Sequence, residues 1–477
     1  MTAAVPDTAA AFALDEVLAA TGGDLVRLGD RTRFVGVTTD TRRLRAGELF
    51  VAIRGDAHDG HDFLVEAARA GAGAVVVERE HAERTLDCAV IAVRDTLAAL
   101  GDLAVFHRRR QRLRVVAVTG SNGKTTTKEM LAAILERALG ADRVLRTLGT
   151  QNNLVGLPLT LLRLGGGEDA AILELGMNGP GEIWRLAQIA QPDVGVVTCV
   201  APAHLEGLGS IHGVAQAKAE LYRRLRPSAT AVVNADDPLV AASAAVFPGR
   251  KVPFGTTADE VAVAAREIVD HGLDGTEFRL VVERQDAAVR LAVPGRHNVT
   301  NALAAAAAAH ALGVDLGTVA AGLEAFQPPG MRMEVTQLPT GVTVLNDAYN
   351  ANPASMTAAL RTLAASRGRR RIAVLGEMRE LGAESARAHR ELGARAAEVR
   401  VDALLLLGEH AADVRAGAEA AGLPGERIFV AADHAELGAH LRGMCRAGDL
   451  VLLKGSRGAA MEEVLRHLQA AGGAPVP

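Results

Sequence analysis

The chain has 477 residues, of which 49% are hydrophobic and 23% charged. This composition supplies apolar side chains for more than one core and, at this length, roughly three domains, which excludes a fibrous or intrinsically disordered protein. The 52 Lys and Arg residues are opposed by 56 Asp and Glu residues, and the net charge of -4 excludes a general basic surface for nucleic acid or an anionic membrane.

The cysteines and the apolar segments indicate the cellular compartment in which the protein works. Cys88, Cys199 and Cys445 lie far apart without metal-ligand spacing, which argues against disulfides or a zinc site and fits a reducing compartment. The first 18 residues lack a cationic signal segment, and the most apolar helix candidate, 302–313, is shorter than a membrane span. We therefore expect a cytoplasmic protein with no membrane insertion and no nucleic acid partner.

The first segment, 1–113, mixes short strand-like runs with helix-like stretches, which predicts a small α/β domain. Its expected strands are 34–38, 49–53, 74–77 and 90–93.

The second segment, 114–327, opens with an apolar run that leads into a glycine-rich loop and a helix ending near Gly140. Apolar runs at 170–175 and 194–200, each followed by helix-like sequence, predict further crossovers of a parallel sheet. The stretch 261–293 is strand-like, but its pattern does not place individual strands. We expect a central domain of the P-loop type.

The third segment, 328–477, begins where PPGM, 328–331, interrupts helical sequence. Strand-like runs then alternate with helices, which favours a Rossmann-like, doubly wound sheet with ligand contacts at the carboxyl ends of its strands. The expected strands are 342–346, 371–376, 401–407, 427–430 and 449–453. The fold class predicted for the whole chain is thus three-domain α/β.

The glycine-rich loop GSNGKTT carries the clearest chemistry. Its glycines permit turns that point backbone amides at a phosphate, and the helix that follows adds its positive dipole end. Lys124 would neutralise the β and γ phosphates, and the hydroxyl of Thr125 would hold Mg²⁺. The predicted Mg-ATP contacts are Gly120, Ser121, Asn122, Gly123, Lys124, Thr125 and Thr126.

The loop departs from the strict P-loop pattern, because Val118 stands where that pattern has a glycine. It also does not by itself distinguish a kinase, an ATPase, a ligase or a nucleotide-gated binding module.

Three further polar residues follow or interrupt apolar elements. Glu174 ends an apolar strand, which predicts a carboxylate at the sheet edge suited to Mg²⁺. His204 also follows an apolar strand, and for a histidine in such a loop a role in the site and a plain surface position are equally consistent with the sequence. Lys218 lies in helical sequence, where local reasoning alone makes it a solvated lysine.

A series of motifs resembles the Mur ligase family. GSNGKTTTKEM, TQNNLVGLPLTLL, ELGMNGPGEI, AHLEGLGS, QAKAEL, PGRHNVTNALAA, NDAYNANPASM, LGEMRELG and LKGSRG occur in the order seen in that family. NDAYNANPASM is similar to the MurF type, whose members add D-alanyl-D-alanine. TTDTR and GELFVAIRGDAHDGHDF near the start resemble the family's UDP-substrate domain, so the likeness covers nearly the whole chain.

The resemblance implies roles for the ATP-site residues. Lys124, Glu174, His204 and Lys218 become the catalytic set, with Thr125, Glu174, His204 and a carbamylated Lys218 holding two metal ions. Asn298, Asn301, Arg332 and Asp347 are implied to contact the nucleotide; helix capping is the alternative for the two asparagines. His297, which precedes them, is given no role.

The resemblance also implies substrate contacts, for each of which a plain turn or surface role is the alternative. These are Thr39, Asp40, Thr41 and Arg42 for the uridine diphosphate, Thr150, Asn152 and Asn153 for the muramoyl peptide, and Asn350, Asn352, Pro353, Lys454, Ser456 and Arg457 for the incoming dipeptide and anionic groups.

The expected function is ATP-dependent ligation through an acyl phosphate, in which a monomeric enzyme joins D-alanyl-D-alanine to UDP-N-acetylmuramoyl-tripeptide. This step would serve peptidoglycan synthesis, and with it cell shape and division, and closure of the third domain onto the ATP site is expected. The alternatives are another Mur-type ligase, a folylpolyglutamate-type ligase or a non-catalytic nucleotide-binding regulatory protein.

Overall fold

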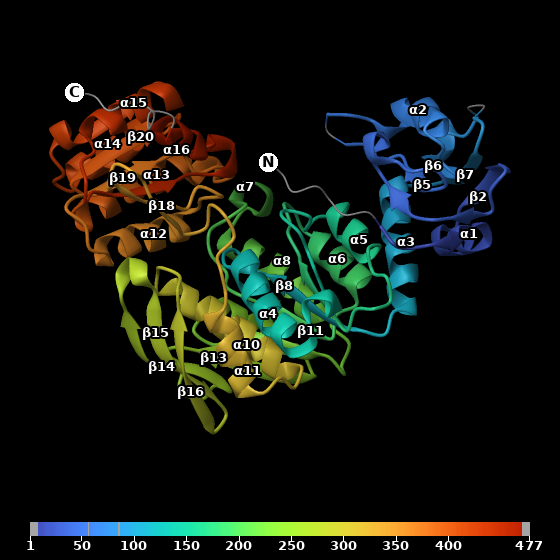
Figure 1. The fold of residues 1–477 in the computed structure, drawn as a ribbon, viewed down its shortest axis with the longest axis horizontal. Coiled ribbons are helices and arrows are strands. Elements are labelled where there is room, and N and C mark those ends of the chain that lie inside the picture. The colour runs from blue at the N-terminus through green and yellow to red at the C-terminus, as the bar shows by residue number, and fades with distance from the viewer. Residues whose placement is uncertain (1–7, 56, 84–85, 470–477) are drawn as a thin grey trace.

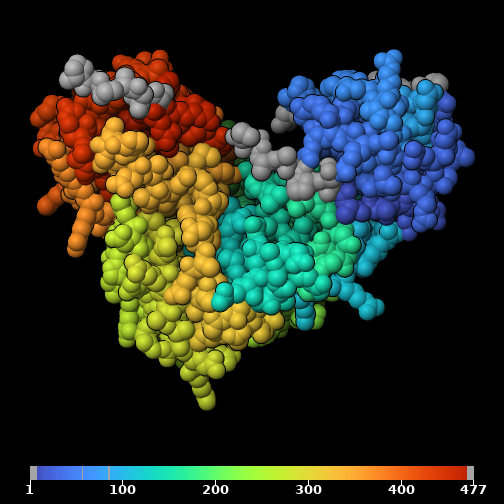
Figure 2. All heavy atoms as spheres, viewed as in Figure 1, coloured from blue at the N-terminus to red at the C-terminus, as the bar shows by residue number. Residues whose placement is uncertain are grey.

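The computed structural model describes residues 8–55, 57–83 and 86–469. Residues 1–7, the start of the segment expected to carry no export signal, and Asp56, inside the GELFVAIRGDAHDGHDF motif, lie outside the described residues. Three separate large sheets give a three-domain α/β architecture, as expected from the sequence (Figure 1). The surface is hollowed between the N-terminal (blue) and C-terminal (red) domains, above the central domain (Figure 2).

The N-terminal sheet has the strand order β2-β7-β6-β5-β4, parallel except for β2. Its strands are β2 (Asp24–Arg27), β4 (Val37–Thr38), β5 (Leu49–Val51), β6 (Ala74–Glu78) and β7 (Ala89–Val93), and its helices are α1 (Leu14–Thr21), α2 (Leu64–Arg69) and α3 (Thr96–Arg110). The expectation of one strand over 34–38 is wrong. Phe34 belongs to β3 (Arg33–Phe34), which pairs with β1 (Phe12–Ala13), whereas Val37 pairs with Leu49, so the segment serves two different ladders.

The central sheet has nine strands in the order β16-β15-β14-β13-β12-β11-β8-β10-β9. The strands are β8 (Arg114–Thr119), β9 (Val144–Arg146), β10 (Ala170–Glu174), β11 (Val194–Val197), β12 (Thr230–Asn234), β13 (Arg250–Gly255), β14 (Val263–Asp270), β15 (Thr276–Val282) and β16 (Gln285–Leu291). Strands β8 to β14 run parallel, and β14, β15 and β16 form an antiparallel meander that accounts for the unplaced 261–293 stretch.

Helices cover both faces of this sheet (Figure 1): α4 (Lys124–Leu139), α5 (Gly156–Leu161), α6 (Glu182–Ala190), α8 (Ile211–Arg224), α9 (Pro238–Ala244), α10 (His297–Ala311) and α11 (Leu316–Glu324). The short α7 (Leu205–Leu208) instead lies between α8 and the C-terminal domain. The alanine-rich α10 packs against α4, α11 and strands β11 to β15. Alanine suits this place because it favours the helix and its methyl group lets neighbouring backbones approach closely.

The C-terminal sheet has the order β17-β18-β22-β19-β20-β21, parallel except for β17. Its elements are β17 (Glu334–Gln337), β18 (Thr343–Asn346), α12 (Pro353–Ala365), β19 (Arg371–Leu375), α13 (Ser385–Glu398), β20 (Ala403–Leu407), α14 (Ala411–Ala420), β21 (Ile428–Ala431), α15 (His434–Met444), β22 (Leu450–Lys454) and α16 (Glu462–Gln469). Alternate residues of β19, β20 and β22 enter two different hydrophobic cores, so both faces are covered, as a doubly wound sheet requires.

Strand β8 is the switch point of the central sheet. The chain passes from β8 through α4 to β9 on one side, and from β10 through α6 to β11 on the other. Loops at the carboxyl end of β8 therefore diverge and leave a crevice, where parallel α/β sheets bind ligands. Within the part of the chain that the structure describes, no helix is both long and apolar enough to cross a membrane.

Candidate active site

The glycine-rich loop occupies the carboxyl end of β8, and two of its glycines have no room for a side chain. Gly120 has φ 145°, and a Cβ there would lie 1.9 Å from Thr198 Oγ1. Gly123 has φ 79°, and its Cβ would lie 2.1 Å from Asn301 Oδ1. Val118, the departure from the strict pattern, is a buried residue of β8, so the strand continues one residue and the turn begins at Gly120.

Lys124 is the first residue of α4 and folds back over the loop, where its Nζ donates to the Gly120 carbonyl at 2.8 Å. Desolvation in the crevice lowers the pKa of Lys124 below its usual value. The amino end of a sixteen-residue helix and a lysine thus point to the same place, which is the arrangement that binds a polyphosphate.

Glu174 lies at the carboxyl end of β10, beside β8, and is 3% exposed. Its Oε2 accepts a hydrogen bond from Thr125 Oγ1 at 2.7 Å, and its Oε1 accepts one from Asn152 Nδ2 at 2.9 Å. Glu174, the carboxylate predicted to bind Mg²⁺, is therefore hydrogen-bonded to the threonine of the phosphate loop through one oxygen and to the TQNN segment through the other.

Lys218 is buried on α8 with 1% of its surface exposed. Its Nζ has no hydrogen-bond partner among the described residues. Desolvation, together with the nearby positive charge of Lys124, holds the pKa of Lys218 well below its usual value. The expectation of a solvated lysine at position 218 is wrong, because Lys218 lies on the buried face of α8 and not on its exposed face.

His204 precedes α7 with φ 54°, an unusual backbone conformation for a non-glycine residue. Its Nδ1 lies 2.5 Å from Glu380 Oε2, and Glu380 belongs to the C-terminal domain. His204 lines the same crevice as the phosphate loop.

The crevice is a cavity of about 480 Å³ between the central and C-terminal domains. It brings together most of the predicted ATP and metal residues, one predicted muramoyl-peptide residue (Asn152) and part of the predicted dipeptide set. These residues are Ser121, Asn122, Gly123, Lys124, Thr125, Thr126, Asn152, Glu174, His204, Asn298, Asn301, Arg332, Asp347, Asn350, Asn352 and Lys454.

The C-terminal residues of the cavity are tied to one another. Lys454 Nζ donates to Asp347 Oδ2 at 2.5 Å and to the Asn350 carbonyl at 2.9 Å, and the Arg332 guanidinium lies 3.8 Å from the centre of the Tyr349 ring. Asn352 caps α12 and its Nδ2 donates to Asn122 Oδ1 at 2.7 Å, so the phosphate loop contacts the C-terminal domain directly.

Asn298 and Asn301 are not helix caps. Asn298 lies inside α10, where its Nδ2 donates to the Pro294 carbonyl at 2.8 Å and its Oδ1 accepts from Asn301 Nδ2 at 2.9 Å. The pair therefore braces the start of α10 against Gly123 of the phosphate loop.

Other predicted site residues do not line this cavity. Thr39, Asp40, Thr41 and Arg42 lie in the N-terminal domain, where Asp40 accepts from Arg42 at 2.7 Å and Thr41 donates to Glu66 at 3.0 Å. The hydrogen bonds of Arg42 lower the pKa of Asp40. Gly120, Thr150, Asn153, Pro353, Ser456, Arg457 and Lys218 are also absent from the cavity lining.

Some of these residues have local structural partners. Asn153 Oδ1 accepts from the Gly156 amide at 2.8 Å, Pro353 is the first residue of α12, and Arg457 pairs with Glu462 at 2.5 Å. Sequence reasoning gave no role to His297, Tyr349 and Cys199, which line the cavity, or to Glu380. LGEMRELG contained Glu380, but its contact with His204 depends on domain packing.

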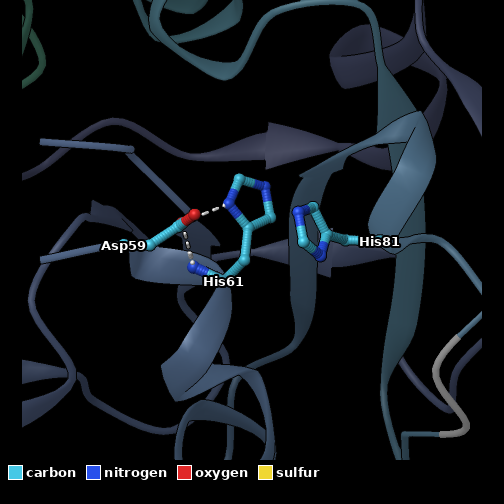
Figure 3. A group of neighbouring side chains, drawn as sticks. All are labelled: Asp59, His61 and His81. Carbon is cyan, nitrogen blue, oxygen red and sulfur yellow. Dashed lines mark hydrogen bonds and ion pairs between the residues drawn. The ribbon is translucent and has the colours of Figure 1, made fainter.

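A second polar cluster, of Asp59, His61 and His81, lies in the N-terminal domain (Figure 3), with its candidate ligand atoms within 4.8 Å of one another. His61 Nδ1 lies 2.6 Å from Asp59 Oδ1, and its Nε2 accepts from the Glu78 amide at 3.1 Å. Arg54 also pairs with Asp59 at 3.0 Å. Since both ring nitrogens of His61 are engaged and a cation already lies beside them, the cluster ties its loop to β6 rather than forming a metal centre.

Comparison with known proteins is decisive for the family. Models described as "Mur ligase family, catalytic domain", "Mur ligase middle domain" and "Mur ligase, glutamate ligase domain" match residues 33–108, 118–309 and 331–457. The UDP-N-acetylmuramoyl-tripeptide–D-alanyl-D-alanine ligase of Escherichia coli K12 is 41% identical over 91% of this chain and 93% of its own length. The chain belongs to the Mur ligase family, in its MurF branch.

Solved MurF structures agree with this membership. The Acinetobacter baumannii MurF structure matches with a TM-score of 0.88 at 32% identity, covering 96% of this chain and 99% of its own. MurF from Thermotoga maritima, solved in complex with ADP, has a TM-score of 0.81 at 29% identity and covers 91% and 97%. A folylpolyglutamate synthase of Mycobacterium tuberculosis shares only the fold, at 19% identity.

Proposed function

We propose that this chain is an ADP-forming, ATP-dependent ligase that joins D-alanyl-D-alanine to UDP-N-acetylmuramoyl-tripeptide, giving the pentapeptide precursor of peptidoglycan. Its curated MurF relatives carry the name of this reaction. The observation that carries the proposal is the single cavity lined by the phosphate loop, by Glu174 and by the C-terminal NDAYNANP segment.

The three domains would divide the substrates between them. Residues 1–113 would bind the UDP part through Thr39, Asp40, Thr41 and Arg42, residues 114–327 would bind ATP, and residues 328–477 would bind the dipeptide and part of the nucleotide. In support, the phosphate loop lies in the central domain, and Arg332 and Asp347 reach the same cavity from the C-terminal one. The roles of Thr150, Asn153, Pro353, Ser456 and Arg457 in substrate binding stay predictions.

The first chemical step would activate the acid. An oxygen of the tripeptide carboxylate attacks the γ-phosphorus of ATP, the bond from that phosphorus to the β,γ-bridging oxygen breaks, and ADP leaves with the electron pair. Lys124 would exchange its bond to the Gly120 carbonyl for a phosphate oxygen, so its charge offsets the repulsion between the two anions.

The second step would form the amide. The free amine of D-alanyl-D-alanine attacks the acyl carbon, the bond from that carbon to the phosphate oxygen breaks, and inorganic phosphate leaves while the nitrogen loses a proton. Asn350 and Asn352 line the same cavity as the phosphate loop, and Asn352 contacts Asn122 of that loop, so a dipeptide held there would lie beside the activated acid.

The donor set of the cavity fits Mg²⁺. Thr125 Oγ1 and Glu174 Oε2 lie 2.7 Å apart, and hydroxyl and carboxylate oxygens are the ligands that this ion prefers. Bound there, with His204 as a further ligand, Mg²⁺ would draw charge from the transferring phosphoryl group.

Lys218 fits the carbamylation that its family implies. A neutral amine is the form that attacks CO₂, and burial beside Lys124 depresses the pKa of Lys218, which favours that form. Formation of the N–C bond, with one C=O electron pair of CO₂ moving onto oxygen and one proton lost to solvent, would convert this neutral amine, which has no hydrogen-bond partner among the described residues, into an anionic oxygen ligand for a second metal ion. Incubation with ¹³C-labelled CO₂ should give a carbamate NMR signal that is missing from Lys218→Met.

We propose that the protein works in the cytoplasm as a monomer, with no nucleic acid partner and no membrane insertion. The net charge of -4 supports the absence of a nucleic acid partner, and the described residues contain no helix long and apolar enough to span a membrane. Light scattering at micromolar concentration should return a mass near 49.6 kDa.

A substrate panel tests the proposed reaction. UDP-muramoyl peptides, folates, single amino acids and D-alanyl-D-alanine are supplied with Mg-ATP, and products are identified by mass. Amide, ADP and phosphate in equal amounts, formed only with the tripeptide and the dipeptide together, would support the proposal. Turnover with a diamino acid or a folate would replace it with a related ligase, and silence from folded, ADP-binding protein would favour a regulatory protein.

A further inference from the structure

Two residues with strained backbones meet across the boundary between the central and C-terminal domains. His204 has φ 54° and Glu380 has φ 64°, and their side chains pair at 2.5 Å through Nδ1 and Oε2. The Glu206 amide also donates to the Glu380 carbonyl at 3.3 Å. Left-handed conformations are costly for residues with a Cβ, and they persist where the surrounding structure enforces them, often at functional sites.

The loop that presents Glu380 is held by hydrogen bonds to the core of the C-terminal domain. The Met378 amide donates to His389 Nε2 at 2.9 Å, and the Arg379 amide donates to Ser456 Oγ at 2.8 Å. The Ser456 amide in turn donates to the Glu377 carbonyl at 2.9 Å. The loop therefore presents the Glu380 carboxylate as a fixed feature of this domain.

The other end of the pair reaches the ATP site. His204 lines the cavity together with Thr125 and Glu174, while Glu380 does not line it. A histidine that uses Nδ1 to donate to a carboxylate keeps its lone pair on Nε2, and this is how outer carboxylates orient metal-binding histidines.

We propose that Glu380 is a positioning residue for the metal site: its carboxylate accepts the Nδ1 proton of His204 and leaves Nε2 for the divalent cation that accompanies the nucleotide. The inference rests on the proposed metal role of His204. Because Glu380 comes from the C-terminal domain, the cation site is complete only when that domain is docked. Linkage then requires that cation binding in turn favour the docked arrangement.

The test measures Mn²⁺ binding by electron paramagnetic resonance, using the full chain saturated with ADP. Glu380→Gln keeps the size but removes the charge, and Glu380→Gly removes the carboxylate while relieving the backbone strain. Both should weaken Mn²⁺ binding, by about tenfold or more, as loss of an outer carboxylate does in other metal sites.

The chain offers a matched control. Glu283 also has a left-handed backbone, φ 53°, and also pairs with a histidine, His310, at 3.4 Å, but neither residue lines the cavity. Glu283→Gln should leave Mn²⁺ affinity unchanged, and equal thermal midpoints among the variants would show that they are folded.

His204→Ala separates this inference from the function on which it rests. If Glu380 acts through His204, the double variant with Glu380→Gly should bind Mn²⁺ no more weakly than His204→Ala alone. Affinities of the Glu380 variants within twofold of the unaltered protein would overturn the positioning role alone. An unchanged affinity in His204→Ala would overturn both that role and the metal role of His204, whereas the ligase reaction itself is judged by the substrate panel.

Discussion

At the scale of single residues, the phosphate loop depends on glycines at positions where any side chain would clash with a neighbouring segment. Gly123 combines a left-handed backbone with contact to Asn301, so any Cβ would displace the asparagine that braces α10. The amides that would hold phosphate are thus fixed by packing against another segment as well as by the turn itself.

Gly123→Ala should therefore cost more than backbone strain. The strain alone amounts to roughly 1–2 kcal/mol for a residue forced into a left-handed conformation, and displacement of the loop should also lower ADP affinity at least tenfold. Calorimetric titration with Mg-ADP and urea unfolding measure the two effects. Gly313→Ala is the control, since Gly313 has φ 86° with open space around it; equal ADP affinities in the two variants would contradict the packing argument.

The residues that sequence could predict are those whose chemistry is local. Lys124 and Thr125 follow from the spacing of one loop, and the cavity does contain them. The burial of Lys218 and the contact of Glu380 with His204 were not predictable from residue type, because both depend on surfaces supplied by other parts of the chain.

At the scale of elements, long apolar runs in the sequence predict strands at the positions where the structure has them, whereas short or polar strands have no such signal. Strands β8, β10 and β11 fell where apolar runs precede helices, whereas β9, β12 and β13 went unnoticed because they are short or mix polar and apolar residues. Strand-like composition indicated β structure over the β14–β16 meander. Its strand boundaries and register depend on which residues pair across the strands, and the sequence pattern does not determine that pairing.

Helix α10 should tolerate no larger side chain on its buried faces. Ala305 is fully buried where the helix lies between α4 and the central sheet. Ala305→Leu would overpack this layer, and we expect a loss of about 1–3 kcal/mol in the free energy of unfolding by urea. Ala416→Leu on the exposed side of α14 makes the same change without burial and should have little effect; equal losses would argue against close packing.

His389 makes the Glu380 loop sensitive to acid. It is 1% exposed, its ring stacks on His410 at 4.5 Å, and Asp413 and Glu377 lie nearby. Burial lowers the pKa of His389 below its usual value of 6.5. The unfolded chain therefore binds more protons in this range, so the stability due to His389 is full above pH 6.5 and falls as pH drops through the folded-state pKa.

The free energy of unfolding, measured by urea titration from pH 7.5 to pH 5, should thus decline less steeply in His389→Gln than in the unaltered protein. His58→Gln, at an exposed position, should keep the original slope. A slope unchanged in His389→Gln would mean that its ring is not held neutral by burial.

At the scale of the molecule, α3 and the domain boundaries decide how the substrates meet. Helix α3 belongs to the N-terminal segment, yet it packs against α5 and α6 of the central domain. On the other side, the pairs Asn122–Asn352 and His204–Glu380 join the central and C-terminal domains beside the cavity. None of these contacts could be predicted from sequence, because each needs the relative placement of two separately folded units.

Ligand binding should draw the domains together. The predicted UDP contacts, Thr39 to Arg42, lie outside the cavity that holds the phosphate loop, so a substrate spanning both needs domains that can close over it. Closure would also exclude water, which otherwise hydrolyses an acyl phosphate. Small-angle X-ray scattering should show a smaller radius of gyration with Mg-ADP and UDP-linked tripeptide together than with either alone. An unchanged radius at saturation, established by separate titration, would contradict the expected closure.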